Sequence, residues 1–309
     1  MGEILEAVVI GAGPAGLTAG IYLMRAGIRA VLVEKAVLGG TPMNYEHVEN
    51  YPGFPEGISS KELMGKMAEQ ARRFGLTMEE FVEVEKVARE GERFVIEGGG
   101  KSLRSLGVIV ATGTVSMRLG IPGEQEFVGR GISYCATCDG NFFRNLDVAV
   151  IGGGDAAIQE GLALANIVRK VYVIHRRDQL RAQKIIQERA FRNEKMEFLW
   201  NKVPVEIEGN DQVEAILLED TQSRERSRVA VDGVFVYVGA RPNTQFLGSL
   251  VERDGAGFVV TNEDLATKTP GLYVAGDARR KSLRQIATAV GDGALAAVSL
   301  EHYLLESRN

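Results

Sequence analysis

The fold is decided near the N-terminus by the stretch VVIGAGPAG, residues 8–16. A short apolar run that predicts a β-strand leads into this turn, and an apolar segment of helical character follows as far as Ala26. Glycines spaced as Gly11, Gly13 and Gly16 between a strand and a helix are typical of a turn that binds a dinucleotide pyrophosphate at the helix N-terminus. A purely structural glycine turn is the alternative.

An acidic residue completes this first pattern. The next predicted strand, Ala30–Val33, ends at Glu34, where a carboxylate can accept hydrogen bonds from the ribose of an adenosine. Because a carboxylate repels a 2′-phosphate, the first site is expected to bind an adenosine without that phosphate, as in FAD.

The same plan recurs later in the chain. The stretch VAVIGGGDAA, residues 148–157, again leads from an apolar run into a glycine turn and a helix, and the next strand ends at His175. The spacing from Gly152 to His175 equals the spacing from Gly11 to Glu34. We therefore predict an α/β fold with two Rossmann-like dinucleotide-binding domains, each with its own parallel sheet.

The second copy differs at the residues that read the nucleotide. His175 is followed by Arg176 and Arg177, with Arg181 a turn further on. A cationic cluster at this position binds a 2′-phosphate, which predicts NADPH rather than NADH. A solvated basic patch is the alternative. We expect Asp155 to cap the helix that follows the glycine turn.

Further predicted elements follow each copy. The predicted strands are Phe81–Glu85, Phe94–Glu97 and Val108–Ala111 after the first copy, and Val203–Ile207, Val213–Leu218 and Val234–Val238 after the second. A helix is predicted between Ser59 and Phe74, where Ser59 and Glu62 have the spacing of a capping box.

The last part of the chain returns to the first domain. Leu272–Ala275 reads as a strand and Gln285–Leu305 as a helix rich in small residues. The predicted organisation is a discontinuous FAD-binding domain, 1–115 and 245–309, with an NADPH-binding domain, 116–244, inserted into it.

The most specific feature is Cys135-Ala136-Thr137-Cys138, which contains the only two cysteines of the chain. A zinc site would need further ligands, and the three histidines stand singly. A structural disulfide across so short a loop would stabilise little. The pair is therefore interpreted as a reversible redox dithiol whose thiolate form reacts. Asp139 is a candidate proton carrier for it, with an N-cap as the alternative.

A second ligand contact is expected where Leu272–Ala275 ends, at Gly276-Asp277. Asp277 can hydrogen-bond a polyol or a ribose, and the helix that opens near Arg284-Gln285 would direct its N-terminus at an anionic reduced flavin. A helix that only packs in the core is the alternative.

Composition limits the remaining possibilities. A chain of 309 residues suits two domains, and its net charge of −5 argues against a nucleic-acid binder. No apolar run is long enough for a membrane span, and the N-terminus has no signal-peptide pattern. We expect a cytoplasmic protein with no metal site.

Taken in order, these motifs resemble those of the bacterial-type, low-molecular-weight thioredoxin reductases, a class of FAD-dependent pyridine nucleotide-disulfide oxidoreductases. The resemblance implies a homodimer that passes electrons from NADPH through FAD to thioredoxin or a thioredoxin-like protein. The matching segments cover essentially the whole chain: Gly11–Gly16, Glu49–Gly53, Ala111–Gly113, Cys135–Gly140, Gly152–Ala157, His175–Arg177, Gly239–Asn243 and Gly276–Asp277.

The resemblance also implies roles for individual residues. Cys138 would face the flavin, Cys135 would attack the partner's disulfide, and Asp139 would be the acid–base group. The implied FAD contacts are Gly11, Gly13, Pro14, Ala15, Gly16, Glu34, Gly40, Asn50, Thr112, Gly113, Gly276, Asp277, Arg284, Gln285 and Ile286. The implied NADPH contacts are Gly152, Gly154, Asp155, Ala156, His175, Arg176, Arg177 and Arg181.

The sequence departs from the family at two positions. Thr41 stands where the family often has Gln, which puts one flavin contact in doubt. Asn141 stands where an aromatic residue is common, directly before Phe142 and Phe143. The thioredoxin-docking surface is therefore expected to differ, and the two phenylalanines can equally be core residues.

The domain map implies a moving part. The cysteines and the NADPH motif both lie on the inserted domain, yet both must reach one flavin, and Cys135 must also reach a protein. We expect the inserted domain to rotate about the two strands near Val115 and Pro242. The rival enzymes are a reductase of a glutaredoxin-like protein or a peroxidase, and a reductase that takes electrons from ferredoxin. A flavin-bearing redox sensor would need neither the dithiol nor the arginines.

Overall fold

The computed structural model describes residues 4–307, which divide into two compact units. The first unit consists of the residues up to Met43, His47–Val115 and the residues from Arg241 onward, and the second consists of Asn44–Glu46 and Ser116–Ala240.

A seven-stranded sheet forms the centre of the first unit, with the order β5-β2-β1-β8-β7-β6 and with β19 paired to β8. Val8 in β1 lies opposite Val31 of β2 and Val108 of β8, both in parallel register. Strand β7 runs antiparallel to β8. The strands are β1 (Ile4–Ile10), β2 (Ala30–Val33), β5 (Thr77–Glu79), β6 (Val84–Glu90), β7 (Arg93–Gly98), β8 (Lys101–Val110) and β19 (Leu272–Val274), with β3 (His47–Val48) and β4 (Ile58–Ser59) forming a separate antiparallel pair.

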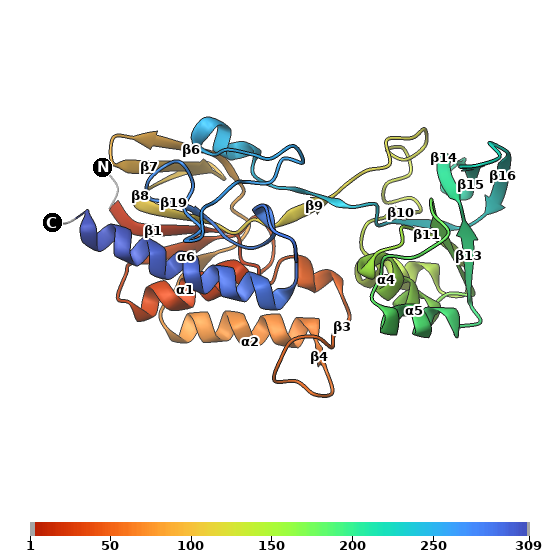
Figure 1. The fold of residues 1–309 in the computed structure, drawn as a ribbon, viewed down its shortest axis with the longest axis horizontal. Helices are drawn as coiled ribbons and strands as arrows, with labels where there is room; N and C mark the ends of the chain where they lie inside the picture. Colours follow the sequence, from red (N-terminus) through yellow and green to blue (C-terminus); the bar gives the residue numbers. More distant parts are fainter. Residues whose placement is uncertain (1–3, 308–309) are drawn as a thin grey trace. The chain divides into compact units, whose positions relative to one another are not determined.

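Successive residues of β1 face two different layers. Ala7 and Val9 belong to the core shared with the helices, whereas Val8 and Ile10 belong to the core shared with β6 and β7. The helices on the first face are α1 (Pro14–Arg25), α2 (Ser60–Arg73) and α6 (Ile286–Glu306), as Figure 1 shows.

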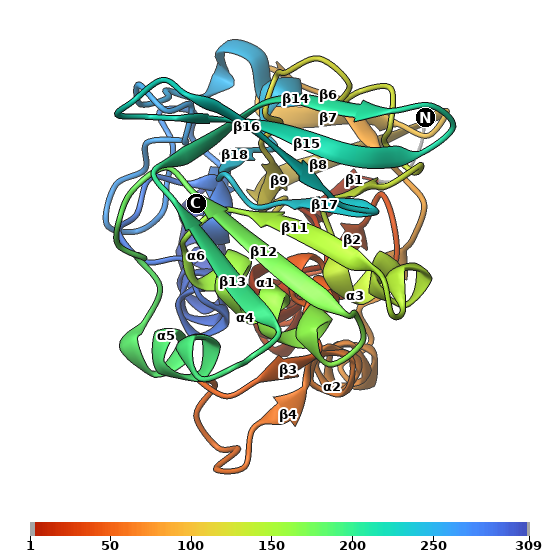
Figure 2. The ribbon, with the colours of Figure 1, turned by 90° about the vertical axis from the view of Figure 1, so that its right-hand side faces the viewer.

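The second unit repeats this plan with a five-stranded parallel sheet of order β10-β17-β11-β12-β13. Val148 and Val150 face the helical layer, and Ala149 and Ile151 face a three-stranded antiparallel sheet, β14-β15-β16 (Figure 2). The elements are β10 (Ile132–Ser133), α3 (Ala136–Asp139), β11 (Asp147–Ile151), α4 (Asp155–Ala165), β12 (Lys170–His175), α5 (Lys184–Phe191), β13 (Met196–Trp200), β14 (Lys202–Gly209), β15 (Val213–Asp220), β16 (Arg226–Ala230) and β17 (Gly233–Val236).

The chain passes to the main part of the second unit through β9 (Thr114–Ser116) and returns through β18 (Ala240–Pro242), and these two strands pair with each other. The short segment Asn44–Glu46 also belongs to the second unit. Four short 3₁₀ helices complete the fold: η1 (Thr41–Asn44), η2 (Gly140–Phe143), η3 (Gln245–Leu250) and η4 (Gly276–Ala278). The predicted α/β class with two Rossmann-type domains is confirmed, with the difference that β6 and β7 add an antiparallel part to the first sheet.

Two local predictions are wrong. The strand expected at Phe81–Glu85 begins only at Val84, and Phe81 is 73% exposed with a positive φ of 61°. Here Val82 N donates to the carbonyl of Glu34 (2.9 Å), so the chain crosses the end of β2 before it turns into β6. The capping box at the start of α2 is also absent: Ser59 makes no side-chain cap, and Glu62 pairs with Lys66 (2.8 Å) instead.

Candidate functional site

The first glycine turn lies between β1 and α1, and two of its glycines are required by the protein's own packing. Gly11 has a φ of +105°, and a Cβ there would lie 2.5 Å from the carbonyl oxygen of Ala111. A Cβ on Gly16 would lie 1.8 Å from the carbonyl oxygen of Gly11. Gly13 differs, because the nearest atom to its Cβ position is 4.0 Å away, on Gly40. Gly13 therefore leaves open space at the helix N-terminus.

Two other segments close around this turn. Gly39 N donates to the carbonyl of Ala12 (2.9 Å), and Gly40, with a φ of +63°, passes so close that a Cβ on it would lie 2.9 Å from the Cα of Gly13. Pro14 is the first residue of α1. A Cβ on Gly276 would lie 3.0 Å from the Cβ of Ala15, so two segments far apart in sequence meet here.

Glu34 is 9% exposed at the end of β2 and holds the turn directly. Its Oε2 accepts from Ala12 N (2.8 Å) and its Oε1 from Ala36 N (3.0 Å). Each oxygen keeps a second lone pair for a ribose hydroxyl.

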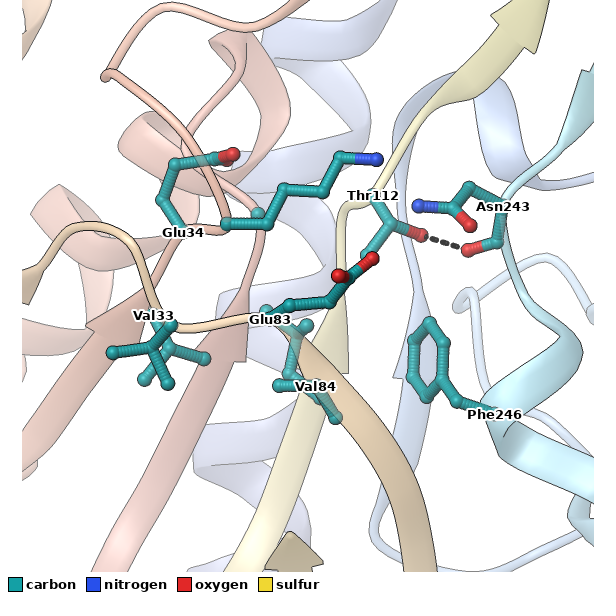
Figure 3. A pocket seen from close by; sticks show the side chains of 11 residues that line it. Val33, Glu34, Glu83, Val84, Thr112, Asn243 and Phe246 are labelled. Atoms are coloured by element: carbon teal, nitrogen blue, oxygen red, sulfur yellow. Dashed lines mark hydrogen bonds between the residues drawn. The ribbon is translucent and has the colours of Figure 1, made fainter. Parts of the chain in front are cut away.

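A pocket opens beside Glu34, at the carboxyl ends of the parallel strands, where ligands bind in such sheets. Thr112 Oγ1 donates to the carbonyl of Asn243 (2.6 Å), and Asn243 N donates to the carbonyl of Gly113 (3.1 Å). Figure 3 shows the polar side chains of this pocket on one side and its apolar side chains on the other. The labelled polar residues are Glu34, Glu83, Thr112 and Asn243, and the apolar ones are Val33, Val84 and Phe246.

Asp277 lies in η4, directly after β19, as predicted for a ligand contact at the end of a strand. Its Oδ1 is buried and has no hydrogen-bond partner among residues 4–307. Burial raises the pKa of Asp277, while the cations Lys281 and Arg284 lower it. An acceptor left unsatisfied at this position calls for a donor from a ligand.

The start of α6 brings together residues from both ends of the first unit. Gln285 is the N-cap residue and forms a capping box with Thr288. Its Oε1 accepts from Asn50 Nδ2 (3.0 Å), which lies far away in sequence. Arg284 is already engaged, because its guanidinium lies 3.9 Å from the centre of the Phe258 ring and its Nε donates to the carbonyl of Asp277 (3.5 Å).

The residues of the first unit fit FAD. Open space at Gly13 lies where the first N–H groups of α1 are free of helical partners. Glu34 offers acceptors to a ribose, and the orphaned oxygen of Asp277 offers one to a hydroxyl or an N–H group. A helix N-terminus with no acidic residue in its first turn favours an anionic pyrophosphate.

In the second glycine turn, too, one glycine is required by the packing and another leaves open space. Gly152 has a φ of +146°, and a Cβ there would lie 2.5 Å from the carbonyl oxygen of Tyr237. Gly154, the N-cap of α4, has no atom within 4 Å of its Cβ position. Ala156 follows in the first turn of α4. The opening at Gly154 therefore corresponds to the opening at Gly13.

The structure brings the arginine segment to this turn. Arg181 N donates to the carbonyl of Gly153 (2.6 Å). Arg176, Arg177 and Arg181 are all exposed, and in the described part of the chain none of them forms an ion pair. Three exposed guanidinium groups beside an open glycine turn fit the phosphates of NADPH.

The prediction that Asp155 caps α4 is wrong. The N-cap is Gly154, without any side-chain cap. Asp155 instead accepts from Gln183 N (2.7 Å) and Gln183 Nε2 (3.0 Å). The carboxylate thus ties the segment that follows Arg181 to the start of α4.

The prediction that His175 belongs to the cationic cluster is also wrong. His175 is 5% exposed, and a Cβ on Gly153 would lie 2.5 Å from its ring. Burial lowers the pKa of His175, and the neighbouring arginines lower it further, so the ring is neutral at pH 7. The His175 ring also contacts Trp200 in a T-shaped arrangement, with ring centres 6.4 Å apart. His175 packs beneath the turn, which leaves the three arginines as the charged groups.

The two cysteines form a disulfide across α3, with their Cα atoms 5.3 Å apart. Cys135 is the N-cap of this short helix, and its Sγ accepts from Cys138 N (3.1 Å). Cys138 is exposed and Cys135 is half-buried. A disulfide within one helical turn can open and close with little change in the backbone.

Asp139 is held next to the disulfide by a residue that the sequence did not point to. Ser133 Oγ donates to Asp139 Oδ2 (2.6 Å) and accepts from Cys135 N (3.0 Å). Asp139 is the N-cap residue of η2, as the alternative reading predicted, but its side chain makes no cap hydrogen bond there. Its carboxylate is therefore oriented by the backbone that carries Cys135.

Tyr237 is a second residue that the sequence did not indicate. Its Oη accepts from Ala136 N (3.0 Å) at the start of α3. Burial raises the pKa of Tyr237 far above its ordinary value, so its hydroxyl stays protonated. Only the proximity of Ser133 to Cys135 in the sequence could have suggested Ser133, and no sequence signal points to Tyr237.

The two departures from the family pattern have different surroundings. Thr41 begins η1, and its Oγ1 lies 4.0 Å from where a Cβ on Gly113 would be. Asn141 accepts from Arg144 Nη2 (3.2 Å). Of the two phenylalanines, Phe143 packs against the buried Phe235 with ring centres 5.2 Å apart, whereas Phe142 is 80% exposed. Phe143 is therefore a core residue, and Phe142 is a surface residue.

Two glycine turns that fit dinucleotides and a disulfide within a helical turn define a pyridine nucleotide-linked disulfide oxidoreductase. A family model described as pyridine nucleotide-disulphide oxidoreductase matches residues 5–293, and the chain belongs to this family. This confirms the predicted family and its cofactors, FAD and a pyridine nucleotide.

Particular relatives narrow the class. A thioredoxin reductase of Bacillus subtilis (strain 168) is 45% identical over 305 residues, which are 98% of this chain and 96% of that protein. The crystal structure of Lactococcus lactis thioredoxin reductase in the FR conformation is 42% identical, with a TM-score of 0.95 over 98% of this chain and 99% of that one. Thioredoxin reductase of Streptococcus pyogenes MGAS5005 is 43% identical, with a TM-score of 0.64 over 98% of this chain and 99% of that one.

Among residues 4–307, no helix has both the length and the apolar character needed to cross a bilayer. The same residues contain no group of three or more His, Cys, Asp and Glu side chains that could hold a metal ion.

Proposed function

We propose that this protein is a thioredoxin reductase that passes two electrons from NADPH through FAD and the Cys135–Cys138 pair to the disulfide of thioredoxin. The single observation that carries the proposal is the disulfide across one turn of α3, next to an oriented carboxylate, in a chain with two dinucleotide-type turns. The names of the relatives at 42–45% identity support it.

The two units divide the cofactors between them. FAD binds the first unit, through the residues around Gly13, Glu34 and Asp277, and NADPH binds the second, through Gly154 and the three arginines. These units are the proposed FAD-binding domain, predicted at 1–115 and 245–309, and the proposed NADPH-binding domain, predicted at 116–244, although the first unit already resumes at Arg241. FAD, when bound, supplies the two-electron relay between a nicotinamide and a disulfide.

The two thiols divide the remaining work. Cys138 is the thiol that faces the flavin, and Cys135 is the one that attacks the disulfide of the partner. Attack breaks the partner's S–S bond and forms a mixed disulfide, which Cys138 resolves to restore the Cys135–Cys138 bond. Asp139, oriented by Ser133, holds the proton that the leaving thiolate takes up.

Turnover requires rotation of the second unit about β9 and β18, because the nicotinamide and the dithiol must reach the same flavin in turn. Two solved relatives support this proposal. At 42% and 43% identity they match this chain with TM-scores of 0.95 and 0.64. A difference of that size at equal identity is expected when whole domains change position.

Thioredoxin is the proposed partner, and Phe142 is a candidate contact because an 80% exposed phenylalanine beside the dithiol helix suits an apolar partner surface. We expect a homodimer in the cytoplasm. A glutaredoxin-like protein or a peroxidase is the remaining alternative for the partner.

The proposal is tested by NADPH consumption by the flavin-loaded protein with a panel of oxidised thioredoxins, a glutaredoxin and a small disulfide. We expect NADPH oxidation that depends on thioredoxin concentration and saturates. A Cys135→Ser variant should lose this activity while NADPH still bleaches its flavin. NADPH consumption that does not depend on the thioredoxin concentration but saturates with glutaredoxin would overturn the choice of partner.

A further inference from the structure

Glu160 is a buried acidic residue that the chemistry above does not use. It lies in α4 and is 3% exposed, between the fully buried Ile158 and Leu164. Besides burial, the groups that shift the pKa of Glu160 are two backbone N–H groups and the carboxylate of Glu46, and none of these is a cation. A carboxylate in such a place is costly to keep ionised.

The groups that influence the charge of Glu160 include the start of the dithiol helix. The backbone N–H groups of Thr137 and Ala136 lie close enough to the Glu160 carboxyl group to lower its pKa. In the same turn, Ala136 N donates to Tyr237 Oη (3.0 Å) and Cys138 N donates to Cys135 Sγ (3.1 Å). The backbone turn whose N–H groups act on Glu160 is therefore the turn that carries the two sulfur atoms.

One oxygen of Glu160 remains unpaired. Glu160 Oε2 is buried and has no hydrogen-bond partner within residues 4–307, and the same holds for Thr137 Oγ1 in the first turn of α3. A protonated carboxyl group offers one donor where an ionised one offers none. The protonated form therefore suits this site better.

Charges around Glu160 favour the same form. Burial raises the pKa of Glu160 to about 8; the N–H donors from Thr137 and Ala136 act against this rise, and the Glu46 carboxylate adds to it. The charges of Glu160, Tyr45 and Asp139 raise the pKa of Tyr237 in turn, and none of these groups is a cation.

We propose that Glu160 is a positioning residue for the dithiol, whose carboxyl group lies against the first N–H groups of α3 and takes up a proton when the disulfide is reduced at alkaline pH. The proposal rests on the proposed function in one respect, namely that Cys135 and Cys138 cycle between disulfide and dithiol.

The proton and electron balance is as follows. Two electrons, supplied by NADPH through the flavin, break the S–S bond, and one sulfur takes a proton from solvent while the other remains a thiolate. The new negative charge lies on the same turn of backbone as the N–H groups that lower the pKa of Glu160, so it raises the proton affinity of that carboxylate. Where Glu160 is ionised in the oxidised protein, reduction therefore takes up a second proton, which oxidation releases.

The test compares the pH dependence of the dithiol potential in the wild type and in Glu160→Gln, an isosteric variant that keeps an acceptor for the α3 amides. The flavin-loaded proteins are equilibrated with oxidised and reduced dithiothreitol between about pH 6.5 and 9.5, and free thiols are counted by alkylation and mass spectrometry. Glu194→Gln, an exposed residue of the same unit, is the matched control.

Above about pH 8, each pH unit should lower the equilibrium constant for reduction of the disulfide about tenfold more in the wild type and the control than in Glu160→Gln. For a two-electron couple, this extra change is about 30 mV per pH unit. Parallel curves for all three proteins would overturn the proposal. This measurement needs no protein partner, so a failure to reduce thioredoxin would count against the proposed function alone.

A second measurement uses the unaltered protein, in case Glu160→Gln does not fold. The infrared difference spectrum between reduced and oxidised wild type at about pH 9 should gain the carbonyl stretch of a protonated carboxyl group. A spectrum without that band would contradict the proposal, whatever the variant does.

Discussion

At the scale of single residues, His175 and Glu34 show how two different side chains fill one structural position. They occupy equivalent places in the two copies of the βαβ plan. Glu34 fixes its glycine turn by accepting from Ala12 N (2.8 Å), whereas His175 packs its ring beneath Gly153. The sequence spacing predicted the equivalence, but it could not predict that His175 points inward, because burial depends on the packing of neighbours such as Trp200.

The burial of His175 gives a prediction for pH. The pKa of His175 is lowered in the folded protein. Just below about pH 6.5, His175 therefore binds a proton in the unfolded chain but stays neutral in the folded chain. This contribution to stability is present above that pH and is lost as the pH falls towards the folded pKa. The loss cannot exceed about 1.4 kcal/mol per pH unit.

The measurement is urea unfolding between about pH 7.5 and 5.5, followed by the fluorescence of Trp200, the only tryptophan. His175→Gln should be less stable than wild type at pH 7.5 but should lose less stability on acidification. An equally steep loss in both proteins would mean that His175 does not titrate in this way.

At the scale of elements, the sequence predicted those parts of the fold that depend on local pattern. The two strand–turn–helix units, the helix from Gln285 and the dithiol were readable because glycine spacing, apolar periodicity and a cysteine pair are local signals. The start of β6 and the partners of Asp155 could not be predicted from the sequence, because both depend on contacts with segments far away in the chain. The same reason hid Tyr237 and Glu160.

The glycine turn gives a prediction that separates folding from binding. Gly16→Ala places a Cβ against the carbonyl oxygen of Gly11 and should unfold or strongly destabilise the first unit. Gly13→Ala meets only open space in an ordinary extended conformation, so it should fold normally and bind FAD at least tenfold more weakly, about 1.4 kcal/mol.

Circular dichroism measures the fold, and flavin released on ultrafiltration measures binding. Retention of FAD by Gly13→Ala with unchanged affinity would show that the open space is not where the dinucleotide lies. Gly154→Ala provides the corresponding comparison in the second unit, where NADPH affinity should fall and FAD content should not.

The arginine segment gives the second prediction at this scale. Arg176→Ala with Arg177→Ala should raise KM for NADPH by about 10- to 100-fold, as expected for lost charge-assisted hydrogen bonds, and should leave KM for NADH nearly unchanged. Arg224→Ala, an exposed arginine of the same unit that pairs with Glu219 (2.8 Å), is the control. Equal increases for both nucleotides would mean that these arginines do not bind the 2′-phosphate.

At the scale of the whole molecule, the proposed cycle depends on movement between two units that are each well packed around separate cores. Apart from the short segment Asn44–Glu46, the chain passes between them through β9 and β18. Two adjacent strands form a narrow connection, which is the kind of link that absorbs a hinge rotation.

A photocleavable crosslink between the two units, attached through non-natural side chains at exposed positions, should stop NADPH-driven reduction of thioredoxin. Illumination should restore it. The same crosslinker placed within one unit should have no effect. Full activity of the protein crosslinked between units would show that rotation is not needed.

The most direct test of the central claim is a thiol count after one reduction cycle without oxygen. The flavin-loaded protein receives one equivalent of NADPH and then oxidised thioredoxin, and all thiols are alkylated and counted by mass. The account predicts two new thiols on thioredoxin for each NADPH, with the Cys135–Cys138 disulfide restored, and none on thioredoxin with Cys135→Ser. Thiols that appear on thioredoxin in the Cys135→Ser variant, or NADPH consumed with the disulfide never opened, would contradict it.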